Sequence, residues 1–347
     1  MRVFFRTDSS TDIGSGHVIR CLALAEELRQ CGAEIIFICR EYMGNLCGFI
    51  ESKGFSVSLL SGNLQAKSAC EDWETDARES AEAIGKCDWL IMDHYGLDKQ
   101  WERHLRKHTR HIMVIDDLAN REHDADILLD QNFNSPLHKN YKSLLPDGCI
   151  FLLGSKYSLI RAEFRLYRDE ALSRRDGSLK RLLVFMGGGD PDNDTVKVLS
   201  GLLSSSIRSI SVDVVLGGSN PYYEKIKQFC KQLPFATLHV QTPRMAELMT
   251  LSDCAINASG STTWERCTLG LPALVVIQSN DQVAVANAVH QRGGHRLLGW
   301  ANKLTSKDYA DALDSLDPDD LLQMSEISAG LCDGRGAIRV AEYLLKF

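Results

Sequence analysis

Short apolar runs alternate with amphipathic helical patterns along most of this chain, and this alternation constrains the fold more than any other feature. The strand-like runs are residues 3–5, 34–39, 55–60, 89–93 and 112–116 in the first half, and 182–186, 212–216, 237–240, 254–257 and 273–277 in the second. Helical patterns lie between them. Strands that alternate with helices form parallel, doubly wound sheets. We therefore predict an α/β protein with two Rossmann-like domains that face each other across a cleft.

The length of the chain also favours two domains, because 347 residues exceed the size at which a single core usually stops growing. We expect an N-terminal domain at 1–155, a linker at 156–180 and a C-terminal domain at 181–347. A final helical pattern at 336–346 either stays with the second domain or packs back on the first. A basic run lies in the expected linker and at its end, and it is either a solvated helix or a weak membrane or phosphate contact: Arg161, Arg165, Arg168, Arg174, Arg175, Lys180 and Arg181.

Composition and charge exclude several classes of protein. The 39 Lys and Arg residues against 46 Asp and Glu give a net charge of -7, which disfavours nucleic acid as a partner. The 11 cysteines are scattered without a Cys-x-x-Cys pair, a pattern typical of reduced cytoplasmic thiols. We find no signal-peptide pattern and no apolar run near the roughly 18 residues that span a bilayer. These features predict a soluble, cytoplasmic protein without stable membrane insertion.

The polar loop that follows the first strand is the main candidate for chemistry. It contains Gly14 and Gly16 and places His17 where an amphipathic helix begins. In an open α/β sheet such loops lie at the carboxyl ends of the strands, where ligands bind. A third glycine, required by the dinucleotide fingerprint, is replaced by Ile19. His17 is therefore either a catalytic group directed at a ligand or a polar residue exposed at a helix start.

Two loops of the second domain have features of a diphosphate site. Gly187, Gly188 and Gly189 precede a helix, so their N–H groups form a nest that suits phosphate, although such a run also simply makes a turn. The candidate caps of that helix are Asp192, Asn193 and Asp194. The second loop is Ser259-Gly260-Ser261-Thr262, which offers hydroxyl and N–H donors. Glu265 follows as either a helix-start acid or an acceptor for two ribose hydroxyls.

Several dispersed motifs point to one family. The run from Ser259 to Cys267, followed by Leu269-Gly270-Leu271-Pro272, resembles the nucleotide-binding signature of UDP-sugar enzymes with the two-domain glycosyltransferase B (GT-B) fold. From residue 1 to about 295 the chain resembles the PseG family of UDP-2,4-diacetamido-2,4,6-trideoxy-beta-L-altropyranose hydrolases of pseudaminic acid biosynthesis. The supporting segments are 6–17, 93–98, 115–121, 128–132, 152–157 and 186–191.

The resemblance implies hydrolysis of a UDP-linked amino sugar to UDP and free sugar, with inversion at the anomeric carbon and without a cofactor. Such a reaction needs a base for water, and imidazole titrates near neutrality. The positive end of the helix dipole favours a neutral, basic His17. The nucleotide is then expected at Gly187, Gly188, Gly189, Asn193, Ser259, Gly260, Ser261, Thr262 and Glu265. The sugar is left to Asp8, Asp12, Gly14 and Gly16.

Other residues leave alternatives open. Tyr95, after a strand end, either contacts the substrate or orients the water with His17, or it is a plain loop aromatic. Asp8 and Asp12 either bind sugar substituents or cap the loop. Asp116 and Asp117 at another strand end are often just a turn. Three histidines have a spacing that could hold zinc, but basic neighbours would repel a cation, so we expect no metal site at His104, His108 and His111.

Two further functions remain compatible with these signals. A glycosyltransferase of the same fold would bind the same UDP-sugar and pass the sugar to an acceptor instead of water. A noncatalytic UDP-sugar-binding protein would keep Glu265 and the glycine nest without needing His17. We favour the hydrolase, because the dispersed motifs resemble the PseG family and because the first domain offers no evident apolar or basic patch of the kind that such a transferase often presents to membrane-held acceptors.

Overall fold

The computed structural model describes residues 1–62, 72–132, 141–207, 210–218 and 220–347. Cys70 and part of the helical pattern expected between the runs 55–60 and 89–93 lie outside these residues. The chain forms two compact units: the first comprises Met1–Arg161 and Arg335–Phe347, and the second comprises Ala162–Gly334. Each unit contains one parallel sheet with helices, which confirms the predicted α/β class with two Rossmann-like domains.

The first unit is built on a seven-stranded sheet in the order β3-β2-β1-β4-β5-β6-β7, in which every neighbouring pair is parallel. Its strands are β1 (Arg2–Thr7), β2 (Glu34–Arg40), β3 (Ser56–Leu60), β4 (Cys87–Asp93), β5 (Thr109–Ile115), β6 (Ile127–Asp130) and β7 (Ile150–Leu153). The strand order reverses between β1 and β4, where Thr7 lies opposite Asp93. Ligands of such sheets bind at this switch point.

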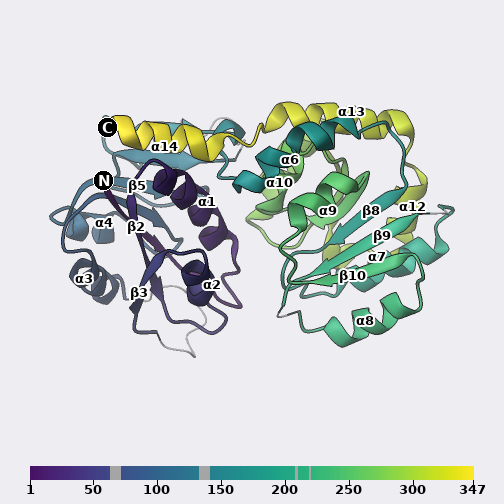
Figure 1. Ribbon diagram of the computed structural model, residues 1–347, viewed down its shortest axis with the longest axis horizontal. Coiled ribbons are helices and arrows are strands. Elements are labelled where there is room, and N and C mark those ends of the chain that lie inside the picture. Colours follow the sequence, from purple (N-terminus) through teal and green to yellow (C-terminus); the bar gives the residue numbers. More distant parts are fainter. Residues whose placement is uncertain (63–71, 133–140, 208–209, 219) are drawn as a thin grey trace. The chain divides into compact units, whose positions relative to one another are not determined.

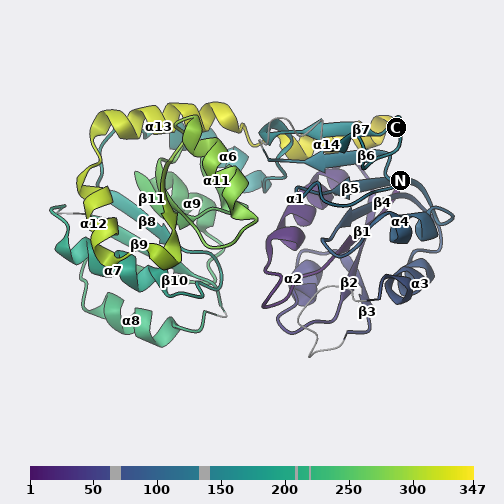
Figure 2. The ribbon, with the colours of Figure 1, turned by 180° about the vertical axis from the view of Figure 1, so that it is seen from behind.

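The helices of the first unit cover both faces of its sheet (Figures 1 and 2). They are α1 (Gly16–Gln30), α2 (Cys47–Ser52), α3 (Trp73–Ile84), α4 (Lys99–Leu105) and α14 (Gly336–Lys346), with a short 3-10 helix, η1 (Ser155–Tyr157). Alternate residues of β1 enter opposite cores: Val3 and Phe5 pack with α1 and α14, and Phe4 packs with α3 and α4. Because both faces of the sheet are covered, successive residues of β1 from Val3 to Phe5 are all apolar.

The second unit repeats the plan with a six-stranded parallel sheet in the order β10-β9-β8-β11-β12-β13. Its strands are β8 (Arg181–Phe185), β9 (Ser211–Leu216), β10 (Ala236–Val240), β11 (Cys254–Ala258), β12 (Ala273–Ile277) and β13 (Arg296–Trp300). Its helices are α6 (Ala162–Ser173), α7 (Asp194–Ser204), α8 (Tyr223–Lys231), α9 (Met245–Leu251), α10 (Thr262–Thr268), α11 (Gln282–Gln291), α12 (Ser306–Asp314) and α13 (Pro318–Leu331), with the 3-10 helix η2 (Ala301–Lys303). The switch point lies between β8 and β11.

The basic run expected in a linker has another role. Residues 162–173 form α6, a helix of the second unit, and Arg168 donates to the carbonyls of Thr268, Ala329 and Cys332 at the ends of α10 and α13. Arg175 donates to the carbonyls of Met249, Ser252 and Leu269 at the ends of α9 and α10. The solvated helix and the membrane or phosphate contact are therefore both wrong for these two arginines, because their donors satisfy helix C-termini.

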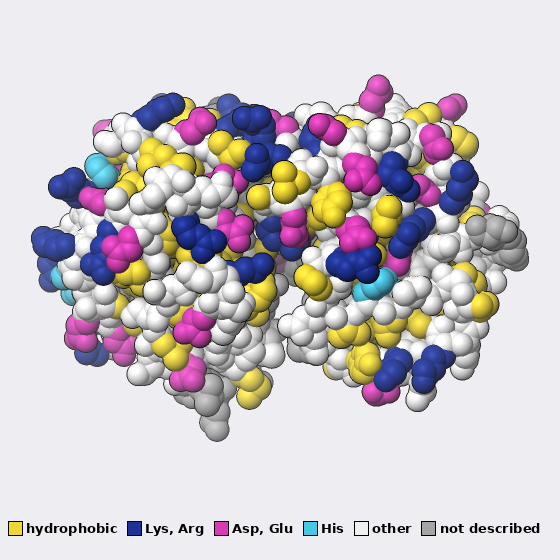
Figure 3. Space-filling model, viewed as in Figure 1, with side chains coloured by type: hydrophobic (Ala, Val, Ile, Leu, Met, Phe, Trp, Pro, Cys, Tyr) yellow, Lys and Arg dark blue, Asp and Glu magenta, His cyan; other side chains and the backbone are white. Residues whose placement is uncertain are grey.

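The surface carries mixed charge. On the face shown in Figure 3, basic and acidic side chains are interspersed over both units. In the part of the chain that the structure describes, no helix is long and apolar enough to cross a membrane.

Candidate active site

The loop after β1 is held in shape by its own serines and by the segment after β2. The Ser10 hydroxyl accepts hydrogen bonds from the N–H groups of Asp12 and Ile13. The Ser9 hydroxyl accepts from the N–H of Leu46. Gly14 has a φ of 80°, which favours glycine, and its N–H donates to the Ser10 carbonyl. These contacts fix the path of the backbone into α1, which begins one residue before His17.

Asp8 lies beneath this loop and not on its surface. Its side chain is fully buried, 2.6 Å from Arg6 Nη1. Asp8 Oδ1 also accepts from the N–H of Arg40 at 2.7 Å, and Oδ2 lies 3.2 Å from His94 Nε2. Burial opposes ionisation, yet Arg6 and His94 hold the pKa of Asp8 below its usual range. Asp8 thus supports the loop structurally, whereas Asp12, Gly14 and Gly16 are wholly or partly exposed and remain predicted sugar contacts.

His17 is joined to the end of β4 by a short hydrogen bond. Its Nδ1 lies 2.6 Å from Asp93 Oδ1. Arg20, one helical turn further along α1, donates from Nε to Asp93 Oδ2 and from Nη2 to Oδ1, both at 2.6 Å. The side chain of Asp93 is fully buried and that of His17 is 11% exposed. The start of α1, which follows β1, and the end of β4 thus build one histidine–carboxylate pair at the switch point.

The charge of Asp93 assigns the tautomer of His17. Burial opposes ionisation, but the Arg20 guanidinium and the hydrogen bond from His17 hold the pKa of Asp93 well below its usual range, so it is a carboxylate. A carboxylate only accepts hydrogen bonds, so we assign the proton of the neutral imidazole to Nδ1. His17 Nε2 then carries a lone pair and can accept a proton. This is the arrangement that a general base requires.

Tyr95 lies against His17. The ring centroids are 4.6 Å apart at an interplanar angle of 83°. The Tyr95 hydroxyl donates to Asp117 Oδ1 at 2.8 Å, and Asn132 Nδ2 donates to Asp117 Oδ2 at 3.2 Å. The structure therefore brings His17 and Tyr95 into contact. It also connects Asp117 to Tyr95 through a hydrogen bond, although the sequence indicated only a turn at Asp117.

Three partners in this site had no predicted role: Asp93, Arg20 and Asn132. Two of them were marked by signals in the sequence. Arg20 lies three residues after His17 on a helix, a spacing that places both side chains on one face. Asp93 ends the fourth strand, whose carboxyl end lies beside that of β1 once the sheet order is known. Asn132 is close only because β6 lies beside β5, and we expected no strand there.

The glycine loop of the second unit leads into α7, but its cap is not among the predicted residues. Asp190 Oδ1 accepts from the N–H of Asp194 at 2.8 Å, and Oδ2 accepts from the N–H of Thr195 at 3.1 Å. Asn193, at the N-cap position, makes no capping hydrogen bond through its side chain. The prediction of Asp192, Asn193 or Asp194 as the cap is therefore wrong, because the left-handed turn at Asp190 and Asn193 brings the earlier carboxylate to the helix start.

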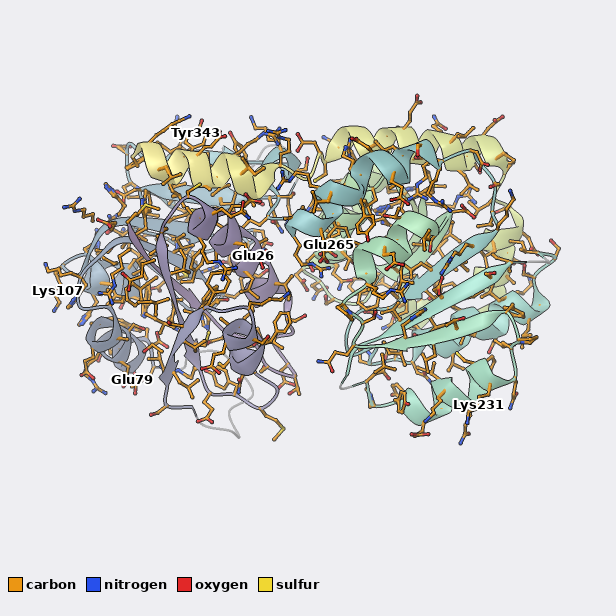
Figure 4. All side chains as sticks on the ribbon, in the orientation of Figure 1. Glu26, Glu79, Lys107, Lys231, Glu265 and Tyr343 are labelled. Carbon is orange, nitrogen blue, oxygen red and sulfur yellow. The ribbon has the colours of Figure 1, made fainter. Side chains whose placement is uncertain are left out.

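The predicted nucleotide residues lie on neighbouring strand ends. The glycine loop follows β8, and Ser259, Gly260, Ser261 and Thr262 follow β11, its neighbour in the sheet. Gly188, Gly189 and Ser261 are exposed, and Glu265 is buried in the first turn of α10, where Figure 4 labels it. Asn193 Oδ1 and Ser259 Oγ are buried and have no hydrogen-bond partner among the described residues. Buried polar atoms of this kind usually meet a ligand or water.

The three histidines near the end of α4 do not gather into a ligand set. His108 Nδ1 lies 3.1 Å from the carbonyl of Gly85, and the ring of His111 packs against Trp89 and Phe347. Within the described ranges, no group of three or more His, Cys, Asp or Glu residues is arranged to hold a metal ion.

Solved structures share this fold. MurG of Acinetobacter baumannii matches with a TM-score of 0.69 at 13% identity, covering 100% of this chain and 99% of that one. UDP-GlcNAc 2-epimerase of Neisseria meningitidis, bound to UDP-GlcNAc, matches with a TM-score of 0.63 at 13% identity, covering 100% of both chains. MnaA of S. aureus, solved with UDP, matches with a TM-score of 0.65 at 13% identity, covering 99% and 97%. The fold is therefore of the GT-B type.

Curated sequences are also similar, whereas no protein-family model matches. The chain is 30% identical over 288 residues to the uncharacterized protein MJ1062 of Methanocaldococcus jannaschii, an alignment that covers 81% of this chain and spans only 57% of that protein. It is 24% identical over 349 residues to the spore coat polysaccharide biosynthesis protein SpsG of Bacillus subtilis, covering 99% and 98%. It is 29% identical over 293 residues to the UDP-2,4-diacetamido-2,4,6-trideoxy-beta-L-altropyranose hydrolase of Campylobacter jejuni, covering 84% and 97%. The resemblance to the PseG family is thereby confirmed.

Proposed function

We propose that this protein processes a nucleotide sugar and, more specifically, that it hydrolyses a UDP-linked diacetamido-trideoxy sugar to UDP and free sugar in pseudaminic acid biosynthesis. The observation that carries the proposal is the His17–Asp93 pair, which leaves a basic nitrogen at the switch point of the first sheet. The Campylobacter relative is named for this activity, and two proteins of similar fold were solved with UDP or UDP-GlcNAc.

The reaction is a single displacement at the anomeric carbon. Water gives one proton to His17 Nε2 while its oxygen forms a bond to that carbon. The bond between the carbon and the β-phosphate oxygen breaks, and its electron pair leaves with UDP. Attack from the side opposite UDP inverts the configuration. Asp93 keeps the imidazole in the required tautomer and stabilises the imidazolium, which later releases its proton to solvent.

We assign the UDP group to the second unit. Gly187, Gly188 and Gly189 offer N–H donors to the diphosphate, and Ser261 and Thr262 offer hydroxyls. The buried oxygens of Asn193 and Ser259, without partners among the described residues, support a polar ligand at this edge. The proposed role of Glu265 is to accept from the two ribose hydroxyls. Donors around a good leaving group take the place of the acid of ordinary glycosidases.

The decisive experiment uses the pure protein without any sugar acceptor. Altrose-configured and bacillosamine-like UDP-diacetamido sugars are supplied, and free sugar is followed by NMR from the first minutes, so that the initial anomer is seen. Free sugar of inverted configuration supports the proposal. UDP release only after an acceptor is added would indicate a glycosyltransferase. UDP binding without turnover under either condition would indicate a binding protein, and both results overturn the hydrolase.

A His17→Asn variant tests the base. Loss of a general base typically lowers kcat by about 10² to 10⁴-fold, while affinity for UDP, measured by calorimetry, should stay unchanged. His104→Asn is the matched control, because His104 is an exposed histidine of the same unit. Full turnover in the His17 variant would remove the base assignment.

A further inference from the structure

We infer that Asp117 is a positioning residue for this reaction: it accepts the hydrogen bond of the Tyr95 hydroxyl and so leaves the Tyr95 oxygen as an acceptor for the attacking water. The inference rests on the proposed hydrolysis and assigns a role to a residue for which the resemblance gives none. A packing role for Tyr95 would need only its ring, whereas this inference depends on which group donates the hydrogen bond between Tyr95 and Asp117.

The direction follows from the chemistry of the two groups. A phenol carries one proton, and an ionised carboxylate carries none, so the 2.8 Å contact between Tyr95 Oη and Asp117 Oδ1 is a hydrogen bond donated by Tyr95. Tyr95 is 37% exposed, but partial desolvation and the Asp117 charge both raise its pKa, so the phenol stays protonated in this setting. The Tyr95 oxygen can then only accept any further hydrogen bond.

Asp117 is itself held in place on its other oxygen. Asn132 Nδ2 donates to Oδ2 at 3.2 Å, and Arg20 Nη1 lies 3.4 Å from the same atom. Oδ1 is thereby directed at Tyr95. Arg20 also makes the two 2.6 Å bonds to Asp93, so one guanidinium holds both the carboxylate behind His17 and the carboxylate behind Tyr95.

Two rings in contact thus each carry a hydrogen-bond acceptor. His17 accepts at Nε2 because Nδ1–H is bound to Asp93, and Tyr95 accepts at Oη because its proton is bound to Asp117; their rings are 4.6 Å apart. A water molecule that donates one O–H to each keeps its lone pairs free for the anomeric carbon. A donor at either position would instead engage a lone pair and weaken the nucleophile.

The test changes the bond direction while keeping the shape. In Asp117→Asn the amide NH2 can donate to Tyr95, which frees the phenol proton to donate to the water. We expect kcat for UDP-sugar hydrolysis to fall about 10 to 100-fold, with KM and UDP affinity within about threefold of wild type. Tyr95→Phe, which keeps the ring and removes the acceptor, should lose a similar factor.

The double variant and a control separate positioning from structure. If Asp117 acts through Tyr95, Asp117→Asn should have no further effect in the Tyr95→Phe background. Asp124→Asn is the control, because this carboxylate of the same unit pairs with Arg106 and lies outside the network. It should keep wild-type kcat.

The outcomes distinguish this inference from the proposed function. If the wild-type protein releases no free sugar, both the proposed function and this inference are overturned. A wild-type protein that hydrolyses the substrate, together with an Asp117→Asn or Tyr95→Phe variant of unchanged kcat, overturns the inference alone. Additive losses in the double variant, or a loss of UDP affinity equal to the loss of kcat, would also overturn it.

Discussion

The pKa values of two buried carboxyl groups of the first unit are shifted in opposite directions, and their neighbours explain why. Asp93 accepts hydrogen bonds from Nε and Nη2 of Arg20, whose charge outweighs the effect of burial and holds the pKa of Asp93 well below the usual range. Asp130 receives the N–H of Asn132 and the hydroxyl of Tyr141, and burial raises its pKa to about 7. Nearby Asp116 and Asp117 add to this rise. Asp93 is therefore a permanent acceptor, whereas Asp130 changes charge near neutral pH.

Asp130 should make the first unit less stable as the pH rises. Between about pH 4, where a free aspartate titrates, and its folded pKa of about 7, the folded state binds the extra proton, so the free energy of unfolding falls with pH. Asp130→Asn removes this dependence. Relative to wild type, the variant should gain on the order of 1 to 3 kcal/mol between pH 5 and pH 8. Urea unfolding at the two pH values measures the difference.

A surface aspartate provides the comparison. Asp147 is exposed, so Asp147→Asn should change the free energy of unfolding by less than about 0.5 kcal/mol at either pH. A relative stability of Asp130→Asn that is the same at pH 5 and pH 8 would contradict the prediction.

The residues of the site show where sequence reasoning ends. The position of His17 at the start of α1 could be predicted, because the glycine loop ends where the helical pattern begins. Asp8 could not be placed, because its burial depends on Arg6, Arg40 and His94, which come from three strand ends. The link from Tyr95 to Asp117 depends on the neighbouring positions of β4 and β5, which no local pattern encodes.

At the scale of elements, α6 and the residues that follow it hold the helices of the second unit by their C-termini. Arg175 is protonated at neutral pH even though burial lowers its pKa to about 10, and it serves the carbonyls of Met249, Ser252 and Leu269. Arg175→Met leaves these acceptors without the charged donor. We expect the second unit to lose about 2 to 4 kcal/mol of unfolding free energy in urea.

The neighbouring arginine is a matched control. Arg174 is exposed, so Arg174→Met should cost less than about 0.5 kcal/mol. Equal losses of unfolding free energy in the two variants would mean that the missing positive charge, and not the missing hydrogen bonds to the helix C-termini, causes the destabilisation.

Elements with strong periodicity could be predicted, and those set by tertiary contacts could not. The final helix was predicted with the bounds it has, Gly336–Lys346. The strands β6 and β7, each four residues long, were missed. The helices α12 and α13 were missed although their starts are marked, by the Thr305–Asp308 capping box and by Asp317 before Pro318.

At the scale of the whole molecule, the chain enters the second unit once and returns to the first for its last helix. In Figure 1, α14 lies alongside α1, and its residues Ala337, Val340, Ala341 and Leu344 belong to the first core. The N-terminal end of α14 packs closely against the backbone of Ser158, because a Cβ at Gly336 would lie 2.2 Å from the Ser158 carbonyl oxygen. Amphipathicity predicted the helix, but its partner could not be derived, since any apolar face would serve.

Adjacent leucines test this docking. Leu344 is 2% exposed and Leu345 is 45% exposed. Leu344→Ala should lower the stability of the first unit by about 2 to 4 kcal/mol, because it leaves a cavity, while Leu345→Ala should have little effect. Hydrogen exchange should show faster opening in peptides of β1 and α1 and no change in β8 and β11. Unchanged exchange in β1 and α1 would contradict the docking.

The return of α14 also sets an order of events on the ribosome. Its binding face on α1 and β4 is translated early, but α14 emerges only after the whole of Ala162–Gly334, a delay on the order of ten seconds or more at usual rates of elongation. The second unit can therefore finish folding while the first still shows an uncovered apolar face. During that interval the nascent chain presents a surface suited to a chaperone, and completion of the first unit waits until residues 335–347 have been made.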